Sequence, residues 1–398
     1  MIGSMATSKR VERDGAGHPA PAAPEKRLFT PGPITTSRTV KQAMLRDFGS
    51  RDPEFLAVVR EVRERLLGLY GLSTEHGWEA IPLQGSGTYA VEAALSSIVP
   101  RAGQVLFLVN GAYGERMVKM AEAHGIPSNV LRWSEDTPVD PAAVDTALAK
   151  DRGLSHVALV HVETTSGVLN PLRAIGELVR RHGRTFFVDA MSSFGALPIE
   201  FEAGGVDVLA ASANKCLEGI PGLSFVLLRR AVLEKSAKTA RTLSLDLHAQ
   251  WRGLEENGQF RFTPPTHVVL ALRQALLEHE QEGGVAGRGR RYRENHERMR
   301  SGMERLGFRA YVPKEHSSPI IGTFLYPEHP RFDFAAFYRG LSERGLLIYP
   351  GKLTKAACFR LGNIGQIFPA DVDALLAAVP EVLAEMGVEL SSPRRPKG

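Results

Sequence analysis

Three short stretches of the 398-residue chain combine residue types that could hold a charged ligand and act on it. The first is Gln84-Gly85-Ser86-Gly87-Thr88, followed by a helical pattern over Tyr89–Ile98. Glycines allow a ligand to approach the backbone, and a helix N-terminus directs N–H groups at an anion. No Gly-Lys-Ser/Thr or GxGxxG motif is present here, so a nucleotide loop is not indicated. The stretch predicts a phosphate site, although a glycine-rich turn with Thr88 as helix cap fits the same residues.

An acid and a lysine follow two apolar runs that are typical of strands. Asp189 ends the run Phe186-Phe187-Val188, and Lys215 follows Ala211-Ser212-Ala213-Asn214. Parallel sheets bind ligands at the carboxyl ends of their strands, where a carboxylate can hold a protonated ring nitrogen. A lysine that loses its charge readily can form a Schiff base with an aldehyde. Taken alone, the acid could be a turn or helix-cap residue, and the lysine could be an ordinary surface lysine.

The combination of these stretches is more specific than any one of them. Pyridoxal 5′-phosphate (PLP) requires a phosphate site, an acid beside its pyridine nitrogen and a Schiff-base lysine. The chain supplies all three in that order. We therefore predict PLP as the cofactor, with Lys215 and Asp189 as the catalytic residues.

The elements that must position these residues alternate between strand and helix. Helical spacing of apolar residues occurs over Phe55–Leu72 and Leu172–His182. Short apolar runs predict buried strands at Val105–Val109, His156–His161, Thr185–Val188, Val206–Ala211 and Ser224–Leu228. Strands and helices at this spacing predict βαβ units and a largely parallel sheet.

The pattern changes after about Val285 to that of a smaller α/β unit. Its expected elements are a charged helix at Tyr292–Leu306, a strand at Pro319–Leu325, a helix at Phe334–Arg344, strands at Leu346–Tyr349 and Cys358–Leu361, and a helix at Pro369–Glu385. We expect the chain to divide into a tail (1–26), a segment joining the small domain and the active-site entrance (27–44), a large PLP-binding domain (45–284), a small C-terminal domain (285–390) and a second tail (391–398).

Composition excludes several classes of protein. Hydrophobic residues make up 43% and charged residues 23% of the chain, which is typical of a soluble globular protein. No apolar run reaches the roughly 18 to 20 residues of a membrane helix, and two cysteines cannot build a disulfide scaffold. The net charge of +5 comes from scattered Lys and Arg, which favours an anionic substrate more than nucleic acid. We expect no metal, no membrane or nucleic-acid partner, and a cytoplasmic location.

The chain resembles the class V aminotransferases of fold type I, which use PLP. Matching stretches run in order over nearly everything between the expected tails: Leu28–Pro33, Leu83–Thr88, Asn110–Gly114, His161–Pro171, Val188–Gly195, Ser212–Gly222, Ser244–Leu247, Arg261–Val269, Ile348–Lys352 and Phe359–Gly365. The stretches Ser212–Gly222, Arg261–Val269 and Phe359–Gly365 point within this class to the transaminases of 2-aminoethylphosphonate and pyruvate.

The resemblance implies an architecture and a reaction. The architecture is a large domain with a mostly parallel seven-stranded sheet flanked by helices, and a smaller α/β C-terminal domain. The reaction converts 2-aminoethylphosphonate and pyruvate to phosphonoacetaldehyde and L-alanine by a ping-pong mechanism, within phosphonate catabolism. The resemblance also implies a homodimer.

The resemblance further implies roles for individual residues. Lys215 would be the Schiff-base lysine and proton shuttle, and Asp189 would pair with the pyridine nitrogen. The cofactor phosphate would be bound by Ser86, Gly87 and Thr88.

The remaining expected contacts come from separate parts of the chain. Tyr113 would stack on the cofactor ring, and Thr164 would reach its O3′ side. Thr266 would reach the phosphate of the neighbouring subunit's cofactor. Arg360 would bind the phosphonate or carboxylate of the substrate, and Gly32 would line the substrate entrance.

Three alternatives compete with this hypothesis. The nearest keeps fold and cofactor and changes the substrate, as in alanine–glyoxylate or serine–pyruvate aminotransferases. A second is a PLP lyase or cysteine desulfurase, which requires a thiol on a mobile loop, whereas Cys358 lies in an apolar strand pattern. The third is a PLP-binding regulator, for which no helix-turn-helix region is evident.

Overall fold

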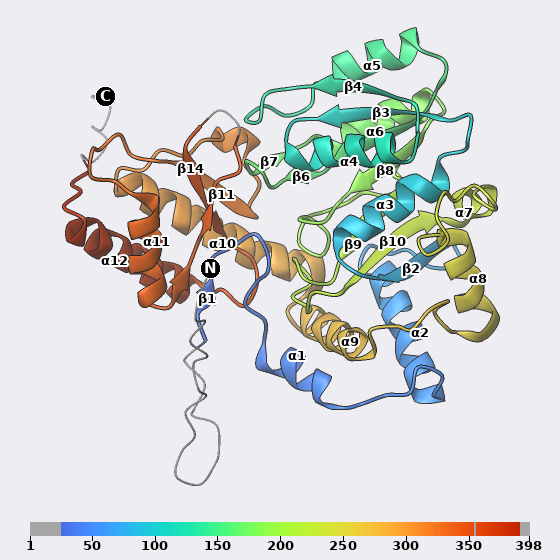
Figure 1. Cartoon of the computed structure of the whole chain (residues 1–398), viewed down its shortest axis with the longest axis horizontal. Helices are drawn as coiled ribbons and strands as arrows, with labels where there is room; N and C mark the ends of the chain where they lie inside the picture. Colours follow the sequence, from blue (N-terminus) through green and yellow to red (C-terminus); the bar gives the residue numbers. More distant parts are fainter. Residues whose placement is uncertain (1–24, 354–355, 391–398) are drawn as a thin grey trace, which may run out of the picture.

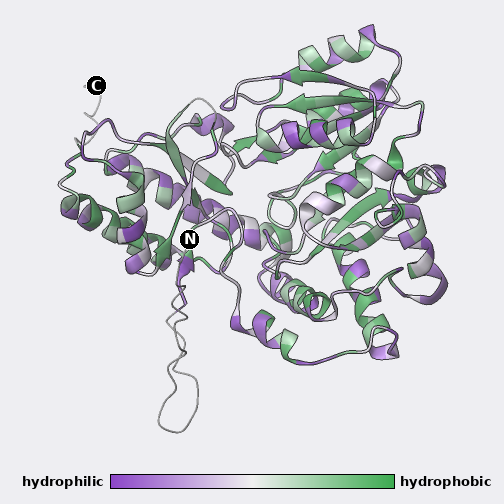
Figure 2. Ribbon diagram, in the orientation of Figure 1, coloured by the Kyte–Doolittle hydropathy of each residue, from purple (hydrophilic) through white to green (hydrophobic). Residues whose placement is uncertain are grey.

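The computed structural model describes residues 25–353 and 356–390, and their elements form two units (Figure 1). The expected tails at 1–26 and 391–398 lie outside the described residues, except for residues 25 and 26. The larger unit packs around one extensive apolar cluster, and the smaller C-terminal unit packs around another. Figure 2 shows hydrophobic strands inside both units and hydrophilic residues along the outer helices.

A seven-stranded sheet forms the centre of the larger unit. β10 runs antiparallel to both of its neighbours, and the remaining neighbouring pairs are parallel. The strands, in spatial order, are β2 (Trp78–Gln84), β10 (Leu223–Arg229), β9 (Val208–Ser212), β8 (Thr185–Asp189), β5 (Leu154–Val160), β3 (Gln104–Val109) and β4 (Ser128–Arg132). The prediction of a mostly parallel seven-stranded sheet is confirmed.

Helices cover this sheet and connect its strands (Figure 1). They are α1 (Arg38–Gln42), η1 (Ala43–Leu45), α2 (Pro53–Gly68), α3 (Gly87–Ile98), α4 (Ala112–Ala123), α5 (Pro141–Lys150), α6 (Leu172–Arg181), α7 (Arg230–Lys235), α8 (Leu247–Asn257) and α9 (Thr266–Gln281). A short antiparallel ladder of β6 (Val162–Glu163) and β7 (Val168–Leu169) follows β5. The side chains of Asp52 and Asp140 accept from backbone N–H groups at the starts of α2 and α5, which fixes where these helices begin.

The smaller unit combines helices with an antiparallel three-stranded sheet in the order β11-β14-β13. Its elements are α10 (Gly284–Arg305), η2 (Lys314–His316), β11 (Ile321–Leu325), α11 (Phe334–Glu343), β12 (Leu346–Leu347), β13 (Tyr349–Pro350), β14 (Cys358–Gly362) and α12 (Pro369–Glu385). The N-terminal strand β1 (Arg27–Leu28) pairs in parallel with β12. The start of the described chain is therefore attached to the C-terminal unit.

The long charged helix differs most from its expected bounds. It was expected over Tyr292–Leu306, but α10 begins at Gly284. Ion pairs of Arg288 and Arg291 with Glu282 anchor the first turns of α10. These contacts offset the low helix propensity of the glycines in this stretch, which composition alone does not reveal.

Candidate active site

The predicted phosphate site lies where β2 ends and α3 begins. Ser86 is the N-cap residue of α3, and Gly87 and Thr88 form its first turn. A Cβ at Gly87 would meet the end of the Met191 side chain, so a larger residue there would displace that side chain. Arg116, on α4, donates from Nη1 to Thr88 Oγ1 at 3.2 Å. Free N–H groups, hydroxyls and a guanidinium thus converge on one point, which suits an anion.

Asp189 is the last residue of β8 and is buried beneath the same cavity. Its Oδ1 accepts a hydrogen bond from Met191 N at 2.9 Å. Burial raises the pKa of Asp189 to about 6, and the nearby Glu163 carboxyl adds to the rise. A buried carboxyl in this state is suited to pairing with a cation brought by a ligand.

Lys215 lies three residues beyond β9, in a turn at the carboxyl edge of the sheet. Its Nζ donates to Pro31 O at 2.5 Å. Burial lowers the pKa of Lys215, and the positive charge of Arg360 lowers it further. A lowered pKa favours the neutral amine that nucleophilic attack requires.

Gly32 lies directly against Lys215. Its φ of +125° is in a region that side-chain-bearing residues rarely adopt, and a Cβ there would collide with Lys215 Nζ. Glycine is therefore needed both for the backbone conformation and for the approach of the lysine.

Tyr113 lies between the cavity and several cations. The Arg116 guanidinium carbon is 4.8 Å and Lys352 Nζ is 5.3 Å from its ring centroid. Burial raises the pKa of Tyr113, but the charges of Lys215 and Lys352 outweigh this effect, so its pKa is lowered overall. The side chain also hydrogen-bonds with Thr164.

Arg360, on β14 of the smaller unit, reaches the cavity of the larger unit. Its Nη1 donates to Thr164 O at 3.0 Å, and its Nε donates to Pro350 O at 3.1 Å. The side chain also hydrogen-bonds with Tyr113. Because only 4% of Arg360 is exposed, these contacts hold a buried guanidinium at the junction of the two units.

The structure thus brings most of the predicted site residues together. Seven of them line one cavity: Ser86, Gly87, Thr88, Tyr113, Thr164, Asp189 and Lys215. Gly32 and Arg360 contact its lining residues. Thr266, the first residue of α9, does not line this cavity.

Sequence reasoning missed three residues of this site. Arg116 and Lys352 supply positive charge around Tyr113. Glu163 is fully buried and accepts hydrogen bonds from Tyr113 N at 3.2 Å and Thr165 N at 3.0 Å. In the sequence, Glu163 directly precedes Thr164 in the polar stretch 163–166, and this position could have indicated a role at the site.

The structure gives no support to a desulfurase thiol at Cys358. Cys358 is buried inside β14, unlike a thiol on a mobile loop. Within residues 25–353 and 356–390, no cluster of three or more His, Cys, Asp or Glu side chains could bind a metal ion. Over the same residues, no helix is long and apolar enough to span a bilayer.

The raised pKa of Asp189 predicts a pH-dependent stability of the cofactor-free protein. Its folded-state pKa of about 6 exceeds the ordinary 3.8. Neutral Asp189 therefore contributes stability at low pH, and this contribution is lost as pH rises through about 6. We expect Asp189→Asn to raise the free energy of unfolding at about pH 7.5 by up to about 3 kcal/mol. Denaturant unfolding between about pH 4 and 8 measures this difference, which should shrink as pH falls.

Asp140→Asn provides the matched control. Asp140 caps α5, where Asn serves equally well, so stability should stay unchanged at each pH. A gain for Asp189→Asn that did not vary with pH, or a loss of stability at neutral pH, would contradict the burial argument.

Curated proteins share extensive sequence with this chain. A protein of Klebsiella pneumoniae named 2-aminoethylphosphonate–pyruvate transaminase is 48% identical over 358 residues, which cover 89% of this chain and 97% of the relative. A Pseudomonas aeruginosa protein of the same name is 48% identical over 361 residues, with 91% and 97% coverage.

Solved structures and a family model lead to the same assignment. The alanine–glyoxylate aminotransferase of Nostoc sp. superposes with a TM-score of 0.84 at 29% identity, covering 94% of this chain and all of that one. The model of the family described as aminotransferase class V matches residues 37–360. Enzymes of this family transfer amino groups with PLP as cofactor. The chain described here therefore belongs to the class V aminotransferases.

Proposed function

We propose that this enzyme transfers the amino group of 2-aminoethylphosphonate to pyruvate, giving phosphonoacetaldehyde and L-alanine, in phosphonate catabolism. The observation that carries the proposal is one cavity lined by Lys215 and Asp189, with the Arg360 guanidinium bonded to Thr164 of its lining. The two curated relatives at 48% identity, both named for this reaction, support the choice of substrates. A cytoplasmic location is part of the proposal, since both cysteines are free thiols.

The residues at the cavity fit PLP. Ser86, Gly87 and Thr88 would bind its phosphate at the N-terminus of α3, where Arg116 adds a positive charge. Among residues 25–353 and 356–390, no cation lies in hydrogen-bond range of the buried Asp189, so a protonated ring nitrogen would compensate its charge. When bound, PLP supplies an electron sink for the bond-breaking step at the substrate carbon.

Lys215 is suited to two tasks. Its neutral amine can bond to the cofactor aldehyde, and after release it can move a proton as general base and acid. Burial, which lowers its pKa, increases the fraction of the neutral form. The contact with Pro31 O and the close approach of Gly32 restrict where Nζ lies. The remaining contacts, Tyr113 against the ring and Thr164 near its O3′ side, complete the proposed binding set.

Positive charge at the substrate end of the cavity favours an anionic tail. Arg360 has a planar fork that can bind a phosphonate in one half-reaction and a carboxylate in the other. Lys352 Nζ lies 5.3 Å from the ring centroid of Tyr113, and Arg360 contacts the same tyrosine. A phosphonate carries nearly two negative charges, whereas a carboxylate carries one. The phosphonate therefore gains more from a second cation. This difference supports 2-aminoethylphosphonate as the preferred amine donor.

We further propose a homodimer in which Thr266 completes the neighbouring subunit's phosphate site. Exposed apolar residues beside the phosphate site support this: Tyr89, Leu243 and Phe262 are 52%, 75% and 45% exposed. Leu243 and Phe262 are adjacent, since Arg261 Nη1 donates to Leu243 O at 2.8 Å and its guanidinium lies over the Phe262 ring. Tyr89 directly follows the phosphate-site residue Thr88 on α3. A second copy of the chain would cover this apolar surface.

A single-turnover experiment tests the proposed function. PLP-loaded protein mixed with 2-aminoethylphosphonate, without any keto acid, should release about one equivalent of phosphonoacetaldehyde per subunit, because the amino group stays on the enzyme. Adding pyruvate afterwards should release about the same amount of L-alanine. Both products can be quantified by mass spectrometry. No aldehyde from the phosphonate, together with keto acid from alanine or serine, would move the donor to a carboxylate amine.

Variants of the two cations test tail recognition. Arg360→Ala should lower kcat/KM for 2-aminoethylphosphonate and for alanine by about 100-fold or more, because a buried charged contact is lost. Lys352→Met should lower kcat/KM for the phosphonate more than for alanine, because it removes only the second charge. Steady-state kinetics with both donors measures these ratios.

Arg300→Ala is the matched control for these variants. Arg300 is an arginine of α10 that bonds to Glu304 and Val312 O, and its loss should leave both ratios unchanged. Wild-type kinetics in Arg360→Ala, or equal losses with both donors in Lys352→Met, would contradict the tail-binding roles.

The dimer proposal is tested by Leu243→Glu. Placing a charge in the apolar surface should shift the protein toward monomers and weaken PLP binding in parallel, because each phosphate site would lack the neighbour's Thr266. Light scattering and PLP titration measure the two effects. Ala384→Glu, at an exposed position of α12, is the control. A fully active wild-type monomer would contradict the shared site.

A further inference from the structure

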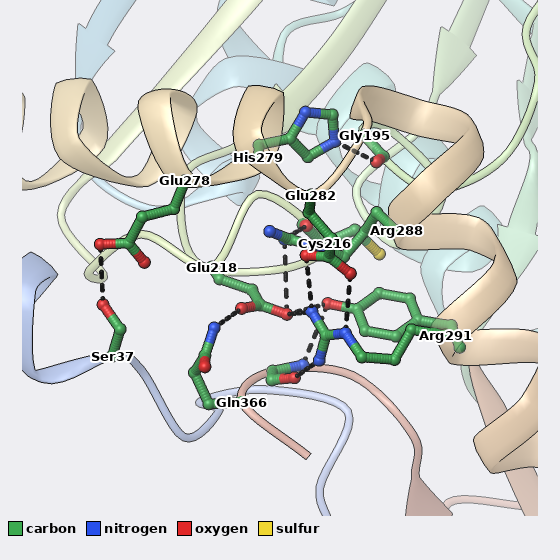
Figure 3. Close-up of polar contacts among 12 residues, drawn as sticks. Ser37, Gly195, Cys216, Glu218, Glu278, His279, Glu282, Arg288, Arg291 and Gln366 are labelled. Carbon is green, nitrogen blue, oxygen red and sulfur yellow. Dashed lines mark hydrogen bonds and ion pairs between the residues drawn. The ribbon is translucent and has the colours of Figure 1, made fainter. Parts of the chain in front are cut away.

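A buried cluster of charged side chains contacts the turn that carries Lys215 (Figure 3). It pairs the carboxylates of Glu218 and Glu282 with the guanidinium groups of Arg288 and Arg291. The side chains of Glu218 and Arg288 are only 2% and 1% exposed. Buried ion pairs are often no more stabilising than apolar packing, so a cluster of this kind calls for a further explanation.

The Glu218 carboxylate is the centre of the cluster. Its Oε1 accepts from Arg291 Nη2 at 2.7 Å and from the Tyr292 hydroxyl at 2.5 Å. Its Oε2 accepts from Gln366 Nε2 at 2.5 Å. Arg288 Nη1 lies 3.4 Å from Oε1. Both oxygens are therefore engaged, each by a partner from a different part of the chain.

Glu218 and Arg288 also hold the backbone of the Lys215 turn. Glu218 N donates to Lys215 O at 2.9 Å, and Arg288 Nη1 donates to Cys216 O at 2.5 Å. Glu218 has a φ of +62°, a left-handed conformation that non-glycine residues adopt at a cost. The side-chain contacts of Glu218 offset this cost and keep the turn in one conformation.

The other side of the cluster holds the segment that follows Arg360. Arg291 Nη1 donates to Gly365 O at 2.6 Å and to Ile367 O at 3.1 Å. The Tyr292 hydroxyl accepts from Gly365 N at 3.1 Å. This segment continues directly from β14, which carries Arg360. The Glu218 carboxylate thus lies between the turn that carries Lys215 in the larger unit and the segment after β14, the strand that carries Arg360 in the smaller unit.

We propose that Glu218 is a positioning residue that sets the distance and orientation of Lys215 relative to Arg360. This inference rests on the proposed function, in which Lys215 acts at the amine-bearing carbon and Arg360 holds the far end of the same substrate. The proton transfer needs both ends of the substrate held at once, and small misplacements of a reacting group are costly. The cluster fixes the turn and the strand against each other, and Glu218, Arg288 and Arg291 do not line the cavity.

Glu218→Gln tests this role with little change in shape. It leaves Arg288 and Arg291 with only the Glu282 carboxylate, so the contacts to both segments should loosen. In cofactor-free protein, amide hydrogen exchange should become about tenfold faster in residues 213–219 and 363–367. In PLP-loaded protein, kcat/KM for 2-aminoethylphosphonate should fall about 10- to 100-fold while PLP remains bound.

Glu79→Gln is the matched control. Glu79 is a fully buried carboxylate on β2 that pairs with Arg63 and Arg230, away from the Lys215 turn. Its substitution should lower the unfolding temperature but leave the exchange of both segments and kcat/KM unchanged. The positioning role is overturned if Glu218→Gln behaves in the same way, with a lower unfolding temperature and nothing more.

Two further outcomes are also decisive. If Glu218→Gln does not fold, Gln366→Leu removes only the contact to Oε2, and faster exchange in residues 363–367 with a lower kcat/KM is expected. Wild-type values for Gln366→Leu would then overturn the proposal. If wild-type protein fails to turn over 2-aminoethylphosphonate, the proposed function fails, whereas the exchange data on cofactor-free protein still decide whether Glu218 holds both segments.

Discussion

A group of cationic side chains gathered around Tyr113, beside the carboxyl edge of the seven-stranded sheet, is the constraint on which the site depends. Lys215, Arg360, Arg116 and Lys352 all lie around the Tyr113 side chain or its cavity. Cations held this closely in a partly desolvated cavity repel one another. The phosphate of PLP and the anionic tail of a substrate would relieve this repulsion, one at each end of the cavity. Affinity for two anions is thus a consequence of how the two units bring their basic residues together.

Buried carboxylates keep this positively charged cavity in shape. Glu163 accepts from the N–H groups at the start of α4, and so connects Tyr113 to the stretch that contains Thr164. Burial raises the pKa of Glu163, and its hydrogen bonds with Thr165 oppose the rise. On the opposite side of the Lys215 turn, Glu218 joins the larger unit to the segment after β14. Each carboxylate uses several donors from different segments, which makes the conformation of those segments interdependent.

Much of this arrangement could be predicted from the sequence where local patterns were strong. The strand ending in Asp189 and the run before Lys215 are mostly apolar, and both form central strands as expected. By contrast, β2 contains Glu79 and Pro82, which hide its strand character. The structure tolerates them because β2 is an edge strand, and because Arg63 and Arg230 pair with the buried Glu79.

Long-range contacts set the limit of sequence-based inference at the site. Lys352 contacts Tyr113 only because the segment after β13 packs near α4. Arg116 lies three residues after Tyr113 on α4, but its contact with Thr88 joins two separate helices. The Glu218 cluster joins residues that lie some seventy to one hundred and fifty positions apart in the chain. The expected role of Thr266 depends on a second copy of the chain, whose cofactor phosphate it would contact.

The covalent site of PLP tests the central claim most directly. Borohydride reduction of the PLP-loaded protein makes the lysine–cofactor bond permanent, and digestion with mass spectrometry then identifies the modified residue. The account predicts modification of Lys215 alone, and none in Lys215→Ala. Modification of another lysine, such as Lys352, or no modification at all would contradict the proposed site.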